Sequence, residues 1–142
     1  MINISRKLEY ALMILNFFEE YSSDGLALTA REISLKLGIP FDTTSKVLQK
    51  LNSNNIVSST QGVRGGYVLT RPIDQISYKD LYESIEGQAA IIKCDSATKK
   101  CEYQDRCSII PPLKKLSHIT KNFYQNISIG DLLNNTEMDY ER

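Results

Sequence analysis

No stretch of this sequence approaches the run of about 18 apolar residues that a membrane-spanning helix needs. The amino-terminal segment MINISRKLEYALMILNFFEE also lacks the form of a signal peptide, because Glu9 interrupts its apolar run and no small-residue cleavage site follows. We therefore expect a cytoplasmic protein with no membrane partner. In that compartment thiols stay reduced, so clustered cysteines bind metal or react more often than they form disulfides.

The sequence also carries no formal net charge. Seventeen basic residues balance seventeen acidic ones in 142 residues, which argues against a binder of any polyanion. The balance hides a local lack of acid: from Thr43 to Ile73 there is no Asp or Glu, whereas four basic residues lie in this segment, namely Lys46, Lys50, Arg64 and Arg71. A neutral protein with such a segment can present a positive face. A chance gap in the charge pattern is the alternative, and the local architecture decides between them.

The length fits one domain, or one small domain with an appended arm. The first predicted helix runs from Ser5 to Tyr21 and carries two apolar stripes on roughly opposite sides. The first stripe comprises Leu8, Ala11, Leu12, Leu15 and Phe18, and the second comprises Tyr10, Met13, Ile14, Phe17 and Tyr21. A helix that is apolar on two faces needs two covers. One is its own domain, and we expect the other to be a second subunit.

The next segment has the pattern of a helix–turn–helix. The motif TARE, residues 29–32, is a capping box that opens a short helix ending at Gly38. The stretch GIPFDTTSKVLQKL then predicts a turn, an N-cap at Asp42 and a third helix. The inward face of this helix comprises Val47, Leu48 and Leu51.

A hairpin follows the third helix. Two β-prone runs, Ile56–Ser59 and Tyr67–Thr70, flank a glycine-rich tip that carries Arg64. The doublet Gly65–Gly66 suits positive-φ turn positions and close approach of the backbone. Pro72 closes the hairpin. A helix, a helix–turn–helix and a hairpin in this order predict a winged helix–turn–helix domain.

The predicted fold class is mainly α with one small β-hairpin. We assign residues 1–76 to the winged helix–turn–helix DNA-binding domain and 77–133 to a helix (Ser77–Glu86), a cysteine segment (92–110) and a long helix (111–128), followed by a polar tail at 134–142. The long helix carries apolar residues at 3–4 spacing, namely Leu113, Leu116, Phe123 and Ile127, with Thr120 filling one gap. This pattern indicates a C-terminal dimerisation helix. A helix packed within its own chain is the alternative.

The third helix is the predicted recognition helix, whose first residues would reach base edges in the major groove. Its outward side chains are Thr43, Ser45, Lys46 and Gln49, with Lys50 beside them. Gln binds adenine in two places, Ser and Thr are permissive, and Lys favours guanine or a phosphate. Arg64 at the wing tip suits a phosphate or minor-groove contact. The combination favours double-stranded DNA over the alternatives, which are ordinary solvated charges and a protein-interaction module.

Cysteine is scarce, and all of it lies in KCDSATKKCEYQDRC. Cys94, Cys101 and Cys107 are separated by six and five residues, and there is no fourth cysteine. Structural zinc sites use four ligands in close pairs, and the single histidine, His118, lies eleven residues past Cys107, so zinc is disfavoured. A redox pair of the thioredoxin type is absent. Loops of this length between thiols suit an iron–sulfur cluster. Three unligated thiols clustered by accident are the alternative.

Taken together, these features resemble the iron–sulfur winged-helix regulators typified by IscR and the nitric-oxide-sensing repressor NsrR. ISRKLEYALMIL resembles the opening helix, and IVSSTQGVRGGYVLTRP resembles the wing, in which RGGY is the most specific part. Three cysteines, a long helix and ISIGDLL complete the same order over nearly the whole chain. The resemblance implies a homodimeric transcription factor that holds one cluster per subunit.

The sequence departs from this family pattern in two places. The first cysteine gap is one residue longer than usual, and Ile110 stands where IscR-like members carry a histidine ligand. NsrR-like members instead use an acidic residue just before an aromatic in the first helix, and Glu9–Tyr10 matches that position. The resemblance therefore makes Glu9 the candidate fourth ligand, reaching the partner subunit's cluster, and favours [4Fe–4S] over [2Fe–2S]. An exposed glutamate favoured by the helix dipole is the alternative.

We thus predict a homodimeric regulator whose affinity for operator DNA is controlled by an iron–sulfur cluster that senses nitric oxide, redox or iron–sulfur status. One alternative is a regulator whose thiols sense oxidants without a cluster. An electron carrier or metal-delivery protein built on a winged domain has less support. An enzyme has least, because no acid–base pair or nucleophile constellation stands out in the sequence.

Overall fold

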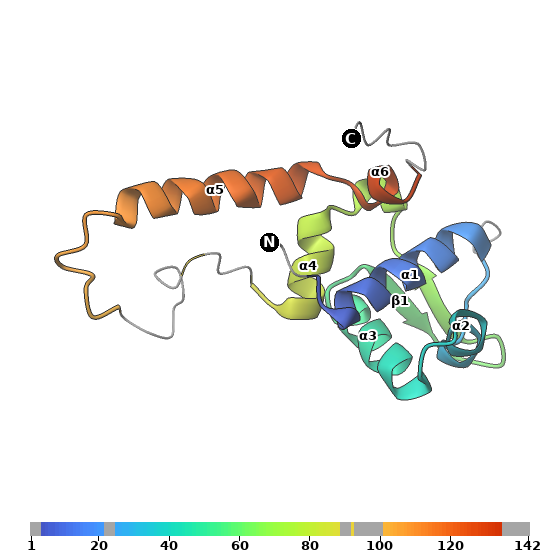
Figure 1. Ribbon diagram of the computed structural model, residues 1–142. Helices are drawn as coiled ribbons and strands as arrows, with labels where there is room; N and C mark the ends of the chain where they lie inside the picture. Colours follow the sequence, from blue (N-terminus) through green and yellow to red (C-terminus); the bar gives the residue numbers. More distant parts are fainter. Residues whose placement is uncertain (1–3, 22–24, 89–91, 93–100, 135–142) are drawn as a thin grey trace, which may run out of the picture.

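The computed structural model describes residues 4–21, 25–88, 92 and 101–134 (Figure 1). Its elements in chain order are α1 (Arg6–Tyr21), α2 (Ala30–Leu37), α3 (Phe41–Ser53), β1 (Val57–Thr60), β2 (Gly66–Leu69), a 3₁₀ turn η1 (Ile73–Gln75), α4 (Tyr78–Glu86), α5 (Ile110–Asn126) and α6 (Ile129–Asn134). The fold is mainly helical with one antiparallel two-stranded hairpin, which confirms the predicted class. None of the helices within the described ranges is long and apolar enough to cross a bilayer.

Helix α2 begins and ends where its sequence signals predict. The Thr29 hydroxyl accepts from the Glu32 backbone N–H, and the Glu32 carboxylate accepts from the Thr29 backbone N–H, which completes the capping box. These bonds lower the pKa of Glu32, because both the backbone and the side chain of Thr29 donate to the charged carboxylate. Gly38 ends the helix with φ +66°, and the Ser34 hydroxyl donates to the Ile39 carbonyl across the turn that follows.

Helix α3 begins two residues earlier than the sequence predicts. Pro40, not Asp42, is its N-cap, and no side chain caps it. The reason is that proline already holds the φ of a chain entering a helix, and the Pro40 carbonyl accepts from both the backbone N–H and the hydroxyl of Thr44. Asp42 therefore lies inside the first turn, where its charge suits the helix dipole.

The hairpin pairs Val57 with Leu69 at its base and Thr60 with Gly66 near its tip. Leu28, in the loop before α2, exchanges two backbone hydrogen bonds with Tyr67 and so lies along the second strand. The predicted close approach at the glycine doublet is confirmed: a Cβ on Gly66 would lie 2.8 Å from the Leu28 carbonyl oxygen. The predicted positive φ at the doublet is wrong, since positive φ in the tip occurs at Gly62 instead.

The core forms around α1. Phe18, Leu15 and Leu8 are fully buried there, together with the inward residues of α3 and α4. Ile14 and Phe17, predicted to face a second cover, turn inward as well. The prediction of two opposite apolar stripes is therefore wrong in part: one broad arc is buried in the domain, and Met13 and Tyr21 of the second stripe remain exposed.

The carboxyl-terminal helices return to the winged domain. Tyr124 of α5 packs edge-on against Tyr78 of α4 and beside Tyr82, and burial there together with these neighbours raises the pKa of Tyr78. Tyr78 N–H donates to Ile127, and Ile129 N–H donates to Ile76. Beyond this anchor, α5 extends away from the rest of the molecule (Figure 1). Because α4 and Ile129 share the core with α1, the boundary after residue 76 is a division of the sequence and stays a prediction.

Replacing Gly66 by alanine should destabilise the fold. The added Cβ would meet the Leu28 backbone, which is held by its two bonds to Tyr67 and cannot move aside cheaply. We expect the free energy of unfolding in urea to fall by about 1–3 kcal/mol. Ser59→Ala, at an exposed position of β1 opposite Tyr67, is the matched control and should change it by less than about 0.5 kcal/mol. Equal stability of both variants would show that the contact is not tight.

Candidate DNA-binding surface and cysteine segment

Helix α3 divides its side chains between the core and the outside. Thr44, Val47, Leu48 and Leu51 are buried. On the other side Lys46 and Gln49 are exposed and Thr43 and Ser45 are half-buried, so the predicted reading residues lie on the outer part of α3. The helix thereby presents hydrogen-bonding groups on a rigid base.

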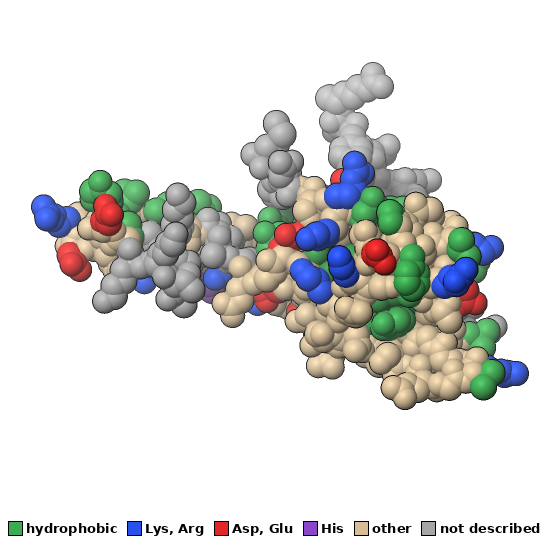
Figure 2. Space-filling model, turned by 90° about the horizontal axis from the view of Figure 1, so that it is seen from below, with side chains coloured by type: hydrophobic (Ala, Val, Ile, Leu, Met, Phe, Trp, Pro, Cys, Tyr) green, Lys and Arg blue, Asp and Glu red, His purple; other side chains and the backbone are tan. Residues whose placement is uncertain are grey.

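The four basic residues of the acid-free segment have different roles. Arg71 donates to the backbone carbonyls of Gln75 and Asn55 and forms an ion pair of 3.4 Å with Asp80, so it fastens the end of the hairpin to α4. Lys46 and Arg64, in contrast, are exposed. Figure 2 shows Lys and Arg side chains spread over the face of the winged domain that lies at the bottom in Figure 1. The positive face expected from the sequence thus depends on fewer residues than the count suggested.

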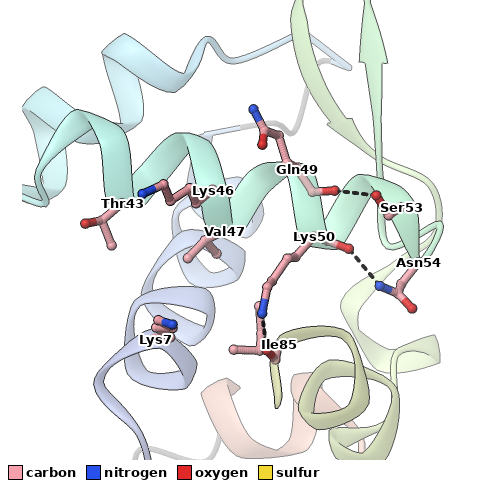
Figure 3. Close-up of a pocket in the computed structure, with 9 residues that line it drawn as sticks. All are labelled: Lys7, Thr43, Lys46, Val47, Gln49, Lys50, Ser53, Asn54 and Ile85. Atoms are coloured by element: carbon pink, nitrogen blue, oxygen red, sulfur yellow. Dashed lines mark hydrogen bonds between the residues drawn. The ribbon is translucent and has the colours of Figure 1, made fainter. Parts of the chain in front are cut away.

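Lys50 differs from its expected role as an outward cation. Its Nζ donates a hydrogen bond to the backbone carbonyl of Ile85, in the last turn of α4 (Figure 3). A cation at a helix carboxyl terminus is favoured by the partial negative charge of the unpaired carbonyls there. Lys50 therefore joins α3 to the end of α4, and a DNA contact by the same side chain stays a prediction.

A hollow of about 530 Å³ lies between α1, α3 and the end of α4. Figure 3 shows its nine lining residues: Lys7, Thr43, Lys46, Val47, Gln49, Lys50, Ser53, Asn54 and Ile85. Three of them are lysines and none is acidic. Lys7 was missed by the sequence analysis, because it precedes the acid-free segment by many residues and only the packing of α1 against α3 brings it here.

Two of the three cysteines lie in the described part of the chain. Cys101 and Cys107 are free thiols, each half-buried, at the two ends of a short turn-rich loop. Two backbone bonds tighten the loop, from Gln104 to Cys101 and from Arg106 to Tyr103. Cys94 lies outside the described residues.

Two other candidate ligands each have a partner on their own helix. Glu9 forms an ion pair of 2.9 Å with Arg6, one turn earlier on α1. His118 is exposed on α5, with Asn122 at 3.1 Å from its Nε2. Within the described ranges, no three Cys, His, Asp or Glu side chains form a group that could hold a metal. Glu9 as the fourth ligand stays a prediction.

The projecting helix α5 carries an exposed apolar stripe. Leu116, Ile119 and Phe123 are each more than half exposed, at 52%, 54% and 57%. Figure 2 shows apolar side chains along this arm. The stripe differs from the predicted seam at its end, because Ile127 lies beyond the helix and packs half-buried against the core.

Comparison with known proteins gives one family. The family model described as "Rrf2: Iron-dependent Transcriptional regulator" matches residues 4–135. The transcriptional regulator IscR of Cronobacter sakazakii is 27% identical over 107 residues, which are 75% of this chain and 65% of the relative. IscR of Escherichia coli K12 gives the same figures. The chain thus matches about two thirds of the length of these relatives.

Solved structures show the same fold. CymR, the global cysteine regulator of Bacillus subtilis, superposes with a TM-score of 0.68 at 20% identity, covering 96% of this chain and all of that one. A transcriptional regulator of Listeria innocua gives 0.71 at 19% identity, with 98% and 91% covered. IscR of T. potens gives 0.64 at 18% identity, with 96% and 89% covered. By its sequence match over residues 4–135, this chain belongs to the Rrf2 family of transcriptional regulators.

Proposed function

We propose that this protein is a homodimeric regulator that binds operator DNA through α3 and the wing, and that an iron–sulfur cluster at the cysteine segment controls its affinity. The observation that carries the DNA part is the polar outer surface of α3 beside an arginine-tipped hairpin. This is the arrangement in which a recognition helix enters the major groove while a neighbouring element contacts the backbone or minor groove.

Each reading residue has a chemical role in this proposal. Gln49 would bind an adenine edge through two hydrogen bonds, and Lys46 would bind guanine or a phosphate. Thr43 and Ser45, half-buried at the start of α3, would position the helix through phosphate oxygens. Arg64, exposed at the wing tip, would enter the minor groove or bind the backbone.

The exposed stripe on α5 supports the homodimer. Leu116, Ile119 and Phe123 follow 3–4 spacing, which is the pattern by which two helices pack side by side. Pairing of two α5 helices would bury these side chains and set the distance between two recognition helices. For reading successive major grooves that distance is about 34 Å.

The cysteine segment has the donors that a cluster requires. Thiolates are the usual ligands of iron–sulfur clusters, and Cys101 and Cys107 are free and half-buried at both ends of one loop. With Cys94 they supply three thiolates, and Glu9 of the partner subunit is the proposed oxygen ligand, which favours [4Fe–4S]. When bound, the cluster would supply an iron that nitric oxide or oxygen can attack.

The end of α4 supplies the connection between the two functions. It leads directly into the cysteine segment, it accepts the Lys50 hydrogen bond from α3, and the Ser5 hydroxyl at the start of α1 donates to Glu86 there. A change in the cysteine segment would therefore shift the end of α4 and, through Lys50, the recognition helix. We call the end of α4, with its contacts to Lys50 and Ser5, the joint. The coupling requires that this joint has two arrangements, and it does not require the thiols to contact DNA.

A second candidate mechanism is thiol sensing without a cluster. The structure has Cys101 and Cys107 as free thiols, the state from which sulfenate or disulfide chemistry begins. One structural neighbour, CymR of Staphylococcus aureus, was solved in an oxidised form, with a TM-score of 0.63 at 17% identity. Both mechanisms use the same joint at the end of α4.

The DNA proposal predicts a sequence preference that α3 controls. Selection from random duplexes by the wild-type protein should yield a two-fold symmetric site. Gln49→Ala should relax the preference at one position in each half-site by about 1–3 kcal/mol, measured by competition binding. Gln125→Ala, an exposed glutamine on α5, is the control and should leave the preference unchanged. An identical site selected by Gln49→Ala would remove α3 as the reader.

The cluster proposal predicts a coloured protein. Anaerobic purification should give visible absorption with bound iron and sulfide, and Cys107→Ser should abolish all three. Glu9→Ala should retain the colour but bleach faster in air, whereas Glu19→Ala, farther along the same helix, should behave as wild type. A colourless protein that forms a disulfide with peroxide and then loses operator binding would favour thiol sensing instead.

The dimer proposal predicts that a charge on the α5 stripe separates the subunits. Phe123→Glu would place a carboxylate where apolar side chains pair, so sedimentation equilibrium should report one chain instead of two. Gln125→Glu adds the same charge on the opposite side of α5 and should remain dimeric. A dimeric Phe123→Glu variant would show that the interface lies elsewhere.

A further inference from the structure

We infer that the hollow between α1, α3 and the end of α4 binds a backbone phosphate of the DNA, with Lys7 of α1 and Lys46 of α3 as its ligands. The inference rests on the proposed DNA-binding function and deepens it. It adds a phosphate contact from a helix that lies outside the helix–turn–helix and the wing.

The hollow lies beside the reading surface of the same helix. Successive residues of an α-helix are rotated by about 100°, so Lys46 lies about 60° from Gln49 and Lys50 about 100° from it. Lys46 and Lys50 therefore lie on one flank of α3, next to Gln49, and both line the hollow. Val47, farther around the helix, faces the core. When the Gln49 side faces base edges, this flank faces one of the two phosphate backbones that border the groove.

The charges of the lining select an anion. The nine lining residues include three lysines and no carboxylate. Lys50 is engaged with the Ile85 carbonyl at the negative end of α4, so it offsets that end and fixes the wall of the hollow. Lys7 and Lys46 are both exposed, and their amines are the positive charges available to an incoming phosphate.

Nearby carboxylates do not cancel this charge. Glu9, two residues after Lys7, is paired with Arg6, and neither Glu9 nor Glu86 at the end of α4 is among the residues that line the hollow. The floor of the hollow is apolar: Val47 and Ile85 are only 3% and 2% exposed. A phosphate entering from solvent would therefore meet two ammonium groups at the rim and a rigid wall beneath them.

The distinguishing variant is Lys7→Gln, because Lys7 is not on the recognition helix. Its affinity should fall equally for the selected operator and for a scrambled duplex, and the selected bases should stay the same. The slope of log affinity against log salt should become less steep by about 0.9 for one lost phosphate contact. The ratio of wild-type affinity to variant affinity should then fall about threefold as the salt concentration rises from 50 to 200 mM. For the double variant Lys7→Gln/Lys46→Gln, the slope of log affinity against log salt should become less steep by about 1.8.

Lys114→Gln removes the same charge from an exposed position on α5, away from the hollow, and should keep the wild-type slope. If the wild-type protein binds its selected operator, an unchanged salt slope for Lys7→Gln would overturn the phosphate site and leave the DNA-binding function standing.

Titration with inorganic phosphate, monitored through the amide signals of Lys7 and Lys46, tests whether the hollow binds a free anion instead of a DNA phosphate. Saturation below about millimolar phosphate with an unchanged DNA slope would reassign the hollow to a small anionic ligand. A wild-type protein that selects no DNA would instead fail the proposed function itself.

Discussion

The packing of α1 into the core is the constraint on which the rest of this structure depends. One broad arc of that helix, including Leu8, Leu15 and Phe18, is buried against α2, α3 and α4. Fixing these three helices on one surface fixes the relative placement of α3 and the end of α4. The exposed polar side of α3 is therefore held by burial on its opposite side, where side chains of Leu or Phe size contribute about 1.5–3 kcal/mol each.

Two side chains fasten the hairpin and α3 to α4. The hairpin is fastened to α4 by Arg71, and α3 is fastened to the end of α4 by Lys50. Helix α3 and the hairpin therefore share one support.

Local signals in the sequence predicted the local structure well. The capping box at Thr29 and the stop at Gly38 are short-range chemistry, and the structure contains both. Asp42 was placed wrongly because Pro40 competes with it for the same helix start, and a proline's fixed φ is not visible in a capping pattern alone. The second apolar stripe of α1 was misjudged because its inner members, such as Ile14, meet α-helices that lie far away in sequence.

Long-range contacts account for what the sequence could not supply. Lys7 belongs to the candidate site only because α1 crosses beside α3, and nothing in its neighbours along the chain marks it. Lys50 looked like one more outward cation, yet a carbonyl 35 residues away accepts its hydrogen bond. Periodicity gives the face of a helix, whereas the partner of a long flexible side chain depends on the assembled fold.

Helix α5 is anchored to the winged domain at its carboxyl end. Tyr124 and the backbone bonds of Ile127 and Ile129 fix its carboxyl end, while its other end adjoins the cysteine segment. Seventeen residues at 1.5 Å each make an arm of about 25 Å. A tilt of about 10° at the tyrosine anchor would move the far end by about 4 Å, given that length. The packing of Tyr78, Tyr82 and Tyr124 thus fixes the direction in which this arm leaves the domain.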